Sequence, residues 1–432
     1  MPRAIRRHKL IALLTVILLA GAVTAGAVVS PAADDADGPL AERRAAAAQR
    51  EADTRGVLAV SNNWDGTVDL VDPESFKRLK RLNVVPDRAE REAAIYTDPV
   101  DLGYFLAIRQ LVGEGHDQFA DDAFTSPDGR FLYVSRPSFA DVVAINMNTG
   151  KIKWRVPIAG QRADHMAISR DGKQILVSAS TARKVHVIDT EKGAIINEFP
   201  SGDSPHENNY SKDGTKIFHA SIGMVYTPLD QPAADSSKGD RWFQIVDART
   251  MKVLKRLDMG QVLDQAGFPD MSAAVRPMTL SPDERFLYFQ VSFFHGFIEY
   301  DLVNNRVRRL VPLPQSESAK ATPREDYLLD SAHHGIAMNP EGTKLCVAGT
   351  MSDYAAIVSR ATGRWRRLDF EAGAKPYWST ESEDGRYCFV SISGSDRVAV
   401  LSFDQEKEVA SFPVGDHPQR MRTGRVRRDF LP

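Results

Sequence analysis

From residue 57 onward, short apolar runs alternate with polar turns, and the pattern repeats about every 42 residues wherever nothing is inserted. Each repeat has an apolar run, a turn such as Ser126-Pro127-Asp128-Gly129, a second apolar run, a third run that ends in Asp, and a fourth run after another turn. Pro and Asp preset such turns, and Gly accepts a positive φ. Each repeat therefore predicts four antiparallel strands.

The number of repeats indicates a closed ring. Six complete repeats begin near residues 119, 161, 203, 274, 331 and 374. A seventh is split, because residues 57 to 85 supply three strands and residues 417 to 426 supply an isolated one. If that last strand joins the first three, the ring closes without an open sheet edge. Residues 57–432 therefore predict an all-β, seven-bladed β-propeller whose N-terminal blade is completed by the C-terminal strand.

Two junctions between repeats carry a family resemblance. Residues 199 to 206 read FPSGDSPH, and residues 412 to 418 read FPVGDHP. Both resemble the Val-Gly-x-x-Pro junctions of YncE-like, YVTN-repeat seven-bladed β-propellers, although several repeats lack the Tyr-Val-x-Asn strand of that family. The resemblance covers about residues 57 to 426 and implies the same fold. It leaves function open, because the superfamily includes lactonase-like proteins, quinoprotein amine dehydrogenase heavy-chain-like proteins and non-catalytic binding proteins.

Four insertions interrupt the repeats, at residues 86–117, 221–241, 257–273 and 315–329. Strand connectivity assigns all four to one rim of the ring, and long loops on one face of a rigid scaffold favour a binding site there. Residues 99 to 113 are dense in apolar side chains and predict a short helix. This helix is expected either to cover the channel mouth as a lid or to pack on the rim.

Residues 1–29 have the pattern of an export signal. Four basic residues, Arg3, Arg6, Arg7 and Lys9, precede an uncharged apolar run from Leu10 to Val29. The small residues at positions 25 to 27 offer a cleavage site, but the run is also long enough to remain as an apolar membrane helix. Residues 30–56 are rich in Ala and charge and predict a solvated stalk. We expect an extracytoplasmic protein, secreted or anchored by its N-terminal helix, with no other membrane contact.

Charge and cysteine content narrow the alternatives further. The chain of 432 residues has 55 basic and 57 acidic residues, so no excess positive charge favours nucleic acid as a partner. Cys346 and Cys388 lie in second strands of adjacent repeats but one register apart. Alternation along a strand would point them to opposite faces, so two buried thiols are expected, and a disulfide only if the register shifts. A monomeric propeller is expected.

The start of each first strand should line the axial channel at the rim that carries the insertions. Aligning the repeats on their turns places seven residues at one level: Asp121, Asp164, His206, Arg276, His334, Tyr377 and Gln419. Neighbouring positions add Arg162, His165, Glu207, His333, Lys375, Trp378, His417 and Arg420. Five of the ten histidines in the chain fall in this zone, which makes the zone the candidate site.

Several interpretations of this zone remain open. The first is recognition of a small polar or anionic ligand, or of a protein partner, by Asp121, Arg162, Arg276, Lys375, Tyr377, Trp378 and Arg420. The second is a transition-metal ion held by His165, His206, His334 and His417. In the third, His165 or His206 acts as a general base beside Asp164 or Glu207. In the last, these residues have only a structural role: they lie at solvated strand starts and are bonded to the backbone. We expect ligand or partner binding, with a metal-dependent oxidoreductase or a lyase or lactonase-type hydrolase as the alternative.

Overall fold

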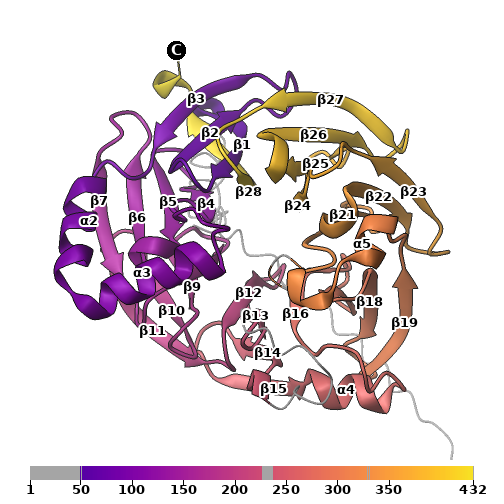
Figure 1. The fold of residues 1–432 in the computed structure, drawn as a ribbon. Coiled ribbons are helices and arrows are strands. Elements are labelled where there is room, and N and C mark those ends of the chain that lie inside the picture. The colour runs from indigo at the N-terminus through magenta and orange to yellow at the C-terminus, as the bar shows by residue number, and fades with distance from the viewer. Residues whose placement is uncertain (1–48, 50, 226–236, 328, 330, 432) are drawn as a thin grey trace, which may run out of the picture. The chain divides into compact units, whose positions relative to one another are not determined.

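The computed structural model describes residues 49, 51–225, 237–327, 329 and 331–431, which form seven four-stranded antiparallel sheets around a common axis (Figure 1). The predicted all-β, seven-bladed propeller is confirmed, as is the completion of the first blade by the last strand. The predicted N-terminal apolar helix and most of the predicted stalk lie outside the described residues. Among the described helices, none is long and apolar enough to cross a membrane.

The first four blades have the following strands. Blade 1 contains β28 (Pro418–Arg427), β1 (Thr54–Asn62), β2 (Thr67–Val71) and β3 (Arg78–Asn83). Blade 2 contains β4 (Asp122–Thr125), β5 (Phe131–Arg136), β6 (Asp141–Asn146) and β7 (Ile152–Pro157). Blade 3 contains β8 (Ala163–Ile168), β9 (Gln174–Ala179), β10 (Lys184–Asp189) and β11 (Ala194–Pro200). Blade 4 contains β12 (Pro205–Tyr210), β13 (Lys216–Ser221), β14 (Trp242–Asp247) and β15 (Val253–Asp258).

The remaining three blades follow the same order. Blade 5 contains β16 (Val275–Leu280), β17 (Phe286–Val291), β18 (Gly296–Asp301) and β19 (Arg306–Pro312). Blade 6 contains β20 (Gly335–Met338), β21 (Lys344–Gly349), β22 (Tyr354–Ser359) and β23 (Trp365–Asp369). Blade 7 contains β24 (Pro376–Glu381), β25 (Tyr387–Ile392), β26 (Arg397–Ser402) and β27 (Lys407–Pro413).

The helices lie in the insertions and at strand ends. The insertion at residues 86–117 forms α2 (Arg88–Thr97) and α3 (Pro99–Leu111), that at 257–273 forms α4 (Met259–Gln265), and that at 315–329 forms α5 (Glu317–Ala321) and η4 (Arg324–Asp326). Residues 226–236 of the remaining insertion lie outside the described residues. Short 3₁₀ turns are η2 (Pro137–Phe139), η6 (Thr350–Ser352), η7 (Ser393–Ser395) and η8 (Arg428–Phe430).

The repeated turn both closes a hairpin and packs one blade on the next. In the first such turn, the Ser126 hydroxyl donates to Asp128 Oδ1 at 2.6 Å and accepts the Phe131 N–H at 2.9 Å. The turn glycines have positive φ, as at Gly172 (69°). A Cβ atom there would lie 2.2 Å from the ring of Pro127 in the preceding turn, so any side chain would collide with it. The close packing of these two turns therefore requires a residue without a side chain at position 172, beside Pro127.

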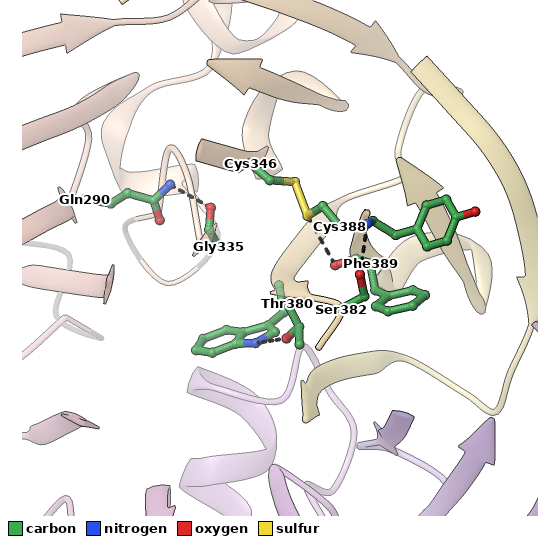
Figure 2. The surroundings of a disulfide bond; sticks show 9 residues. Gln290, Gly335, Cys346, Thr380, Ser382, Cys388 and Phe389 are labelled. Atoms are coloured by element: carbon green, nitrogen blue, oxygen red, sulfur yellow. Dashed lines mark hydrogen bonds between the residues drawn. A yellow bond between two sulfur atoms is a disulfide. The ribbon is translucent and has the colours of Figure 1, made fainter. Parts of the chain in front are cut away.

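Apolar clusters fill the space between adjacent blades, and one of them contains a disulfide. Cys346 of β21 is bonded to Cys388 of β25, so the expectation of two free thiols was wrong (Figure 2). Register alone does not decide this pairing, because neighbouring blades stack face to face. Blade 6 meets blade 7 with one face of its sheet, and blade 7 meets blade 6 with the opposite face of its own. A difference of one residue in register is what brings these two side chains together.

Candidate functional site

A cavity of about 120 Å³ lies at the mouth of the channel, on the face that carries the insertions. The seven residues that the alignment of repeats places at one level all line it: Asp121, Asp164, His206, Arg276, His334, Tyr377 and Gln419. Each of them comes from a different blade and lies in its first strand or one residue before that strand. Arg162 and Arg420 also line the cavity.

A recurrent irregularity in the first strands aims these side chains inward. Pairing with the second strand shifts register between Ala163 and Met166 in blade 3, and between Pro205 and Asn208 in blade 4. Blades 5 and 7 have the same shift, between Val275 and Met278 and between Pro376 and Ser379. Bulges of this kind bend a strand and redirect its side chains. Two consecutive residues at each bulge, including Asp164 with His165 and His206 with Glu207, are thereby buried near the axis.

Helix α3 forms the roof of the cavity and runs from the rim toward the ring axis (Figure 1). Its lining residues are apolar: Tyr104, Ala107, Ile108 and Leu111, followed by Val112. On its other side Phe105 packs in a cluster with Val85, Ile95, Phe119 and Phe139. The helix therefore both packs on the rim and covers the mouth. Tyr104 and Leu111 remain 44% and 52% exposed, which marks the side of the cavity that is open to solvent.

The segment after α3 is attached to the ring by groups that the sequence placed at the channel. Lys375 forms an ion pair with Glu114, and His417 Nε2 lies 3.6 Å from Glu114 Oε1. Trp64 stacks between His116 and His417, with ring centroids 3.8 Å from each. Neither Lys375 nor His417 lines the cavity. The structure therefore separates His417 from the other three histidines proposed as metal ligands.

Two buried ion pairs lie in the floor of the cavity. Arg420 Nη1 donates to Asp121 Oδ1, and Arg162 Nη1 donates to Asp164 Oδ2, both at 2.5 Å. Burial raises the pKa of Asp121 to about 7, against the lowering effect of the Arg420 charge. On the other side of the cavity, Arg276 donates to Ser292 Oγ at 3.0 Å and to the Leu329 carbonyl. The floor is thus built from guanidinium and carboxylate groups held in place by hydrogen bonds.

Three of the candidate histidines come together beside these pairs. The ring centroid of His206 lies 3.8 Å from that of His165 and 5.8 Å from that of His334. Burial and the positive charge of Arg420 lower the pKa of all three well below the ordinary value, so the rings are neutral. His165 is bonded through Nδ1 to Glu207 Oε2 at 2.6 Å. His334 stacks on Tyr377 at 4.1 Å.

Two groups of side chains have a geometry that suits a metal ion. One consists of His165, His206 and Glu207, and the other of Asp121, Asp164 and His165. In each group, one potential ligand atom per residue lies within 4.8 Å of the others. The sequence had placed Asp121 and Asp164 among the ligand-binding and catalytic candidates, so the second group combines residues to which different roles were assigned.

Trp378 and several unforeseen residues complete the surroundings. Trp378 is buried behind the lining, where Arg420 and Arg422 stack on its ring at 5.1 and 5.0 Å and its Nε1 donates to Thr380 Oγ1 at 3.1 Å. Residues that sequence reasoning missed include Gln118, Ser180, Thr181, Ser204, Ile222, Val225 and Leu329. Ser180, Thr181 and Ile222 directly follow second strands, so the ends of those strands were the signal that pointed to them.

The fold and the site define a seven-bladed β-propeller with a partly covered, charged channel mouth. Residues 112–214 match the family model of YNCE-like beta-propellers, which confirms the YncE-like resemblance. No curated protein matches the chain in sequence.

Solved structures show the same fold at low identity. Kuenenia stuttgartiensis hydrazine synthase is 16% identical with a TM-score of 0.56, over 80% of this chain and 92% of that chain. Selenomethionine-substituted virginiamycin B lyase from Staphylococcus aureus is 14% identical with a TM-score of 0.50, over 68% of this chain and 83% of that chain. A streptogramin B lyase structure matches with the same values. At these identities the similarity concerns the fold alone.

Proposed function

We propose that this protein is an exported propeller that binds a small organic anion between the channel floor and helix α3. The observation that carries the proposal is the composition of the cavity wall. Three guanidinium groups, those of Arg162, Arg276 and Arg420, lie beneath a roof of apolar side chains from α3. Asp164 and Asp121 pair with Arg162 and Arg420, so Arg276 supplies the unbalanced positive charge of the lining. Guanidinium groups pair with carboxylates and similar anions in a fixed geometry, and an apolar wall accepts a hydrocarbon body.

The size of the cavity limits the ligand. A volume of about 120 Å³ holds about four water molecules at about 30 Å³ each, so the enclosed part of the cavity fits a group of about the size of a benzene ring. A short acid with a flat or compact apolar part has this size. A peptide loop of a protein partner does not fit inside, which favours the small anionic ligand among the interpretations of the sequence.

Export is part of the proposal and is supported by two features. The first is the basic and apolar pattern of residues 1–29, which is typical of a signal for secretion. The second is the Cys346–Cys388 disulfide, because such bonds persist in oxidising compartments outside the cytoplasm. N-terminal sequencing of the protein from the culture medium and from membranes tests this part. Recovery of the intact chain only from the cytoplasm would contradict it.

Anion binding is tested by calorimetric titration with benzoate and hexanoate, and with benzyl alcohol and hexanol as neutral analogues. We expect the acids to bind and Arg276→Gln to weaken their binding about ten- to a hundredfold, because a charge-assisted hydrogen bond contributes about 1.5–3 kcal/mol. Arg308→Gln is the matched control. Arg308 lies on β19, is 55% exposed, contacts Glu299 and does not line the cavity. Equal affinity for acids and alcohols would contradict the proposal.

Catalysis is the second candidate function, and the buried His165–Glu207 pair favours it. Glu207 fixes the orientation of the His165 ring, and His206 packs against that ring while lining the cavity. A general base must lie within hydrogen-bond reach of the substrate, and His206 lines the cavity in a neutral form that can accept a proton. If so, wild-type protein should open small lactones that His206→Gln protein leaves intact. Identical chromatograms for the two proteins after prolonged incubation would exclude this function.

A further inference from the structure

Besides Arg162 Nε, Arg420 Nε, His206 Nδ1 and His334 Nδ1, three further polar atoms around the floor of the cavity are buried with no hydrogen-bond partner among the described residues. They are Asp121 Oδ2, Asp164 Oδ1 and His165 Nε2. The three residues are no more than 1% exposed, and one potential ligand atom of each lies within 4.8 Å of the others. A buried polar atom without a partner costs about 1–3 kcal/mol, and here three such atoms occur together. Their convergence therefore requires an explanation.

In each of these side chains the other polar atom is held firmly. Asp121 Oδ1 accepts from Arg420 Nη1. Asp164 Oδ2 accepts from Arg162 Nη1 and from Ser180 Oγ, the latter at 2.9 Å. His165 Nδ1 is bonded to Glu207 Oε2, and in the tautomer with the hydrogen on Nδ1 a lone pair remains on Nε2. Anchoring one atom of a histidine or carboxylate while the other stays free is how outer groups orient metal ligands.

The spacing of the free atoms suits one metal ion. His165 Nε2 and Asp164 Oδ1 are 3.7 Å apart, although neither can donate a proton to the other while His165 Nδ1 carries the hydrogen and Asp164 is ionised. Two ligands at about 2.1 Å from a tetrahedral ion are about 3.4 Å apart. An ion between these two atoms therefore needs a ligand shift of only a few tenths of an ångström.

We propose that Asp121, Asp164 and His165 bind a single divalent first-row transition-metal ion. One imidazole nitrogen and two carboxylate oxygens are a donor set for zinc, manganese or iron(II), whereas calcium and magnesium prefer oxygen alone. The carboxylates of Asp121 and Asp164 are paired one to one with the guanidiniums of Arg420 and Arg162, and each carboxylate keeps its second oxygen unpaired.

The group of Asp121, Asp164 and His165 suits the ion better than the group of His165, His206 and Glu207. In the latter, both oxygens of Glu207 are already bonded, Oε2 to His165 Nδ1 and Oε1 to Asn209 Nδ2, so Glu207 offers no unpaired oxygen. Because Asp121 and Asp164 line the cavity, the bound ion has an open position on that side. Three protein ligands and one open position are typical of metal sites that bind an exogenous molecule. This inference goes beyond the proposed anion binding, which depends on the arginines alone.

The test uses the full chain without a histidine tag, stripped with EDTA and titrated separately with Zn²⁺, Mn²⁺ and Co²⁺. We expect one equivalent of tightly bound metal by mass spectrometry, with visible absorption bands for the Co²⁺ form. Asp164→Asn and His165→Gln should each weaken binding at least tenfold. Glu207→Gln should retain the metal with about ten- to a hundredfold lower affinity, because it removes only the orienting bond. His295→Gln, whose ring is bonded to Tyr327 instead, is the matched control.

Failure to bind one equivalent of any of the three metals by the wild-type chain would overturn the proposal, and this result does not depend on whether a variant folds. Undiminished binding in both Asp164→Asn and His165→Gln would also overturn it. Titration of the stripped protein with benzoate separates this proposal from the preceding one. If the stripped protein binds benzoate, the anion site is supported whatever the result for the metal. If the protein binds metal but not benzoate, the metal site is supported and the anion site is contradicted.

Discussion

His333 shows that a histidine at the level of the channel is not by itself part of a site. Its Nδ1 accepts the Gly296 N–H at 2.8 Å, so its Nε2 carries the hydrogen and donates to the Tyr354 hydroxyl at 2.8 Å. Burial lowers its pKa to about 3, and the neighbouring ring of His295 adds to this effect. The adjacent His334 lines the cavity instead. Successive side chains of an extended chain point to opposite sides, so His333 is bonded within the fold while His334 faces the cavity.

The pKa of His333 predicts a defined acid sensitivity. The unfolded chain takes up a proton at this residue below pH 6.5, whereas the folded chain does so only near pH 3. The free energy of unfolding should therefore fall as the pH falls from 6.5 to 3, by about 1.4 kcal/mol per pH unit from this residue. Urea unfolding at pH 7, 6, 5 and 4 measures it, and His333→Gln should show a slope smaller by that amount. Equal slopes would mean that His333 is charged in the folded protein.

The positions of most site residues were predictable, because the repeat fixes their phase. Aligning the turns is sufficient to bring Asp121, His206 and Arg276 to one cavity. Lys375 and His417 were not predictable in this way. Both have a positive φ, of 49° and 54°, immediately before the first strand, and the chain there departs from the extended form that the alignment assumes. The convergence of three unpaired atoms depends on distances across the ring, which a linear pattern does not contain.

At the scale of elements, neighbouring blades are joined by contacts between strands that are distant in sequence. The Cys346–Cys388 bond connects β21 with β25, and one blade earlier Gln290 of β17 donates to the Gly335 carbonyl of β20 at 3.0 Å (Figure 2). The strands themselves were predicted from the alternation of apolar residues. The pairing of the cysteines was not, because it depends on which faces of two blades meet.

Removing the disulfide should destabilise the ring measurably. The bond joins residues 42 positions apart, and closing a loop of that length in the unfolded chain corresponds to about 4 kcal/mol. Cys346→Ala/Cys388→Ala should lower the free energy of unfolding by about 2–4 kcal/mol in urea titrations. Adding a reductant should destabilise the wild-type protein in the same way and leave the double variant unaffected. A wild-type protein that is insensitive to complete reduction would contradict the prediction.

At the scale of the whole ring, β28 connects the two ends of the chain. It pairs with β1, and its Arg422 forms two hydrogen bonds with Asp122 at the start of β4, at 2.9 and 2.7 Å. The same strand contributes Gln419 and Arg420 to the cavity. The closure was predictable because an isolated strand pattern at one end of the sequence matches a missing strand at the other.

Deleting residues 418–432 should therefore abolish cooperative folding, since it removes the edge of blade 1 and its contacts with blade 2. We expect the truncated chain to lose its thermal transition in circular dichroism. A synthetic peptide of residues 418–432, added during refolding, should restore the transition, whereas the same peptide with Arg422→Ala should restore it less well. A truncated chain that melts cooperatively near the wild-type temperature would show that β28 is dispensable.

The position of Arg420 also has a consequence for biogenesis. Ribosomes make the chain from the N-terminus, so Arg420, which orients Asp121, leaves the exit tunnel after all the strands of blades 2 to 7. Until then blade 1 lacks a strand, and the cavity lacks Gln419 and Arg420. The proposed anion and metal ion can therefore bind only after β28 has been made, and binding must take place wherever the chain folds with this strand in the ring.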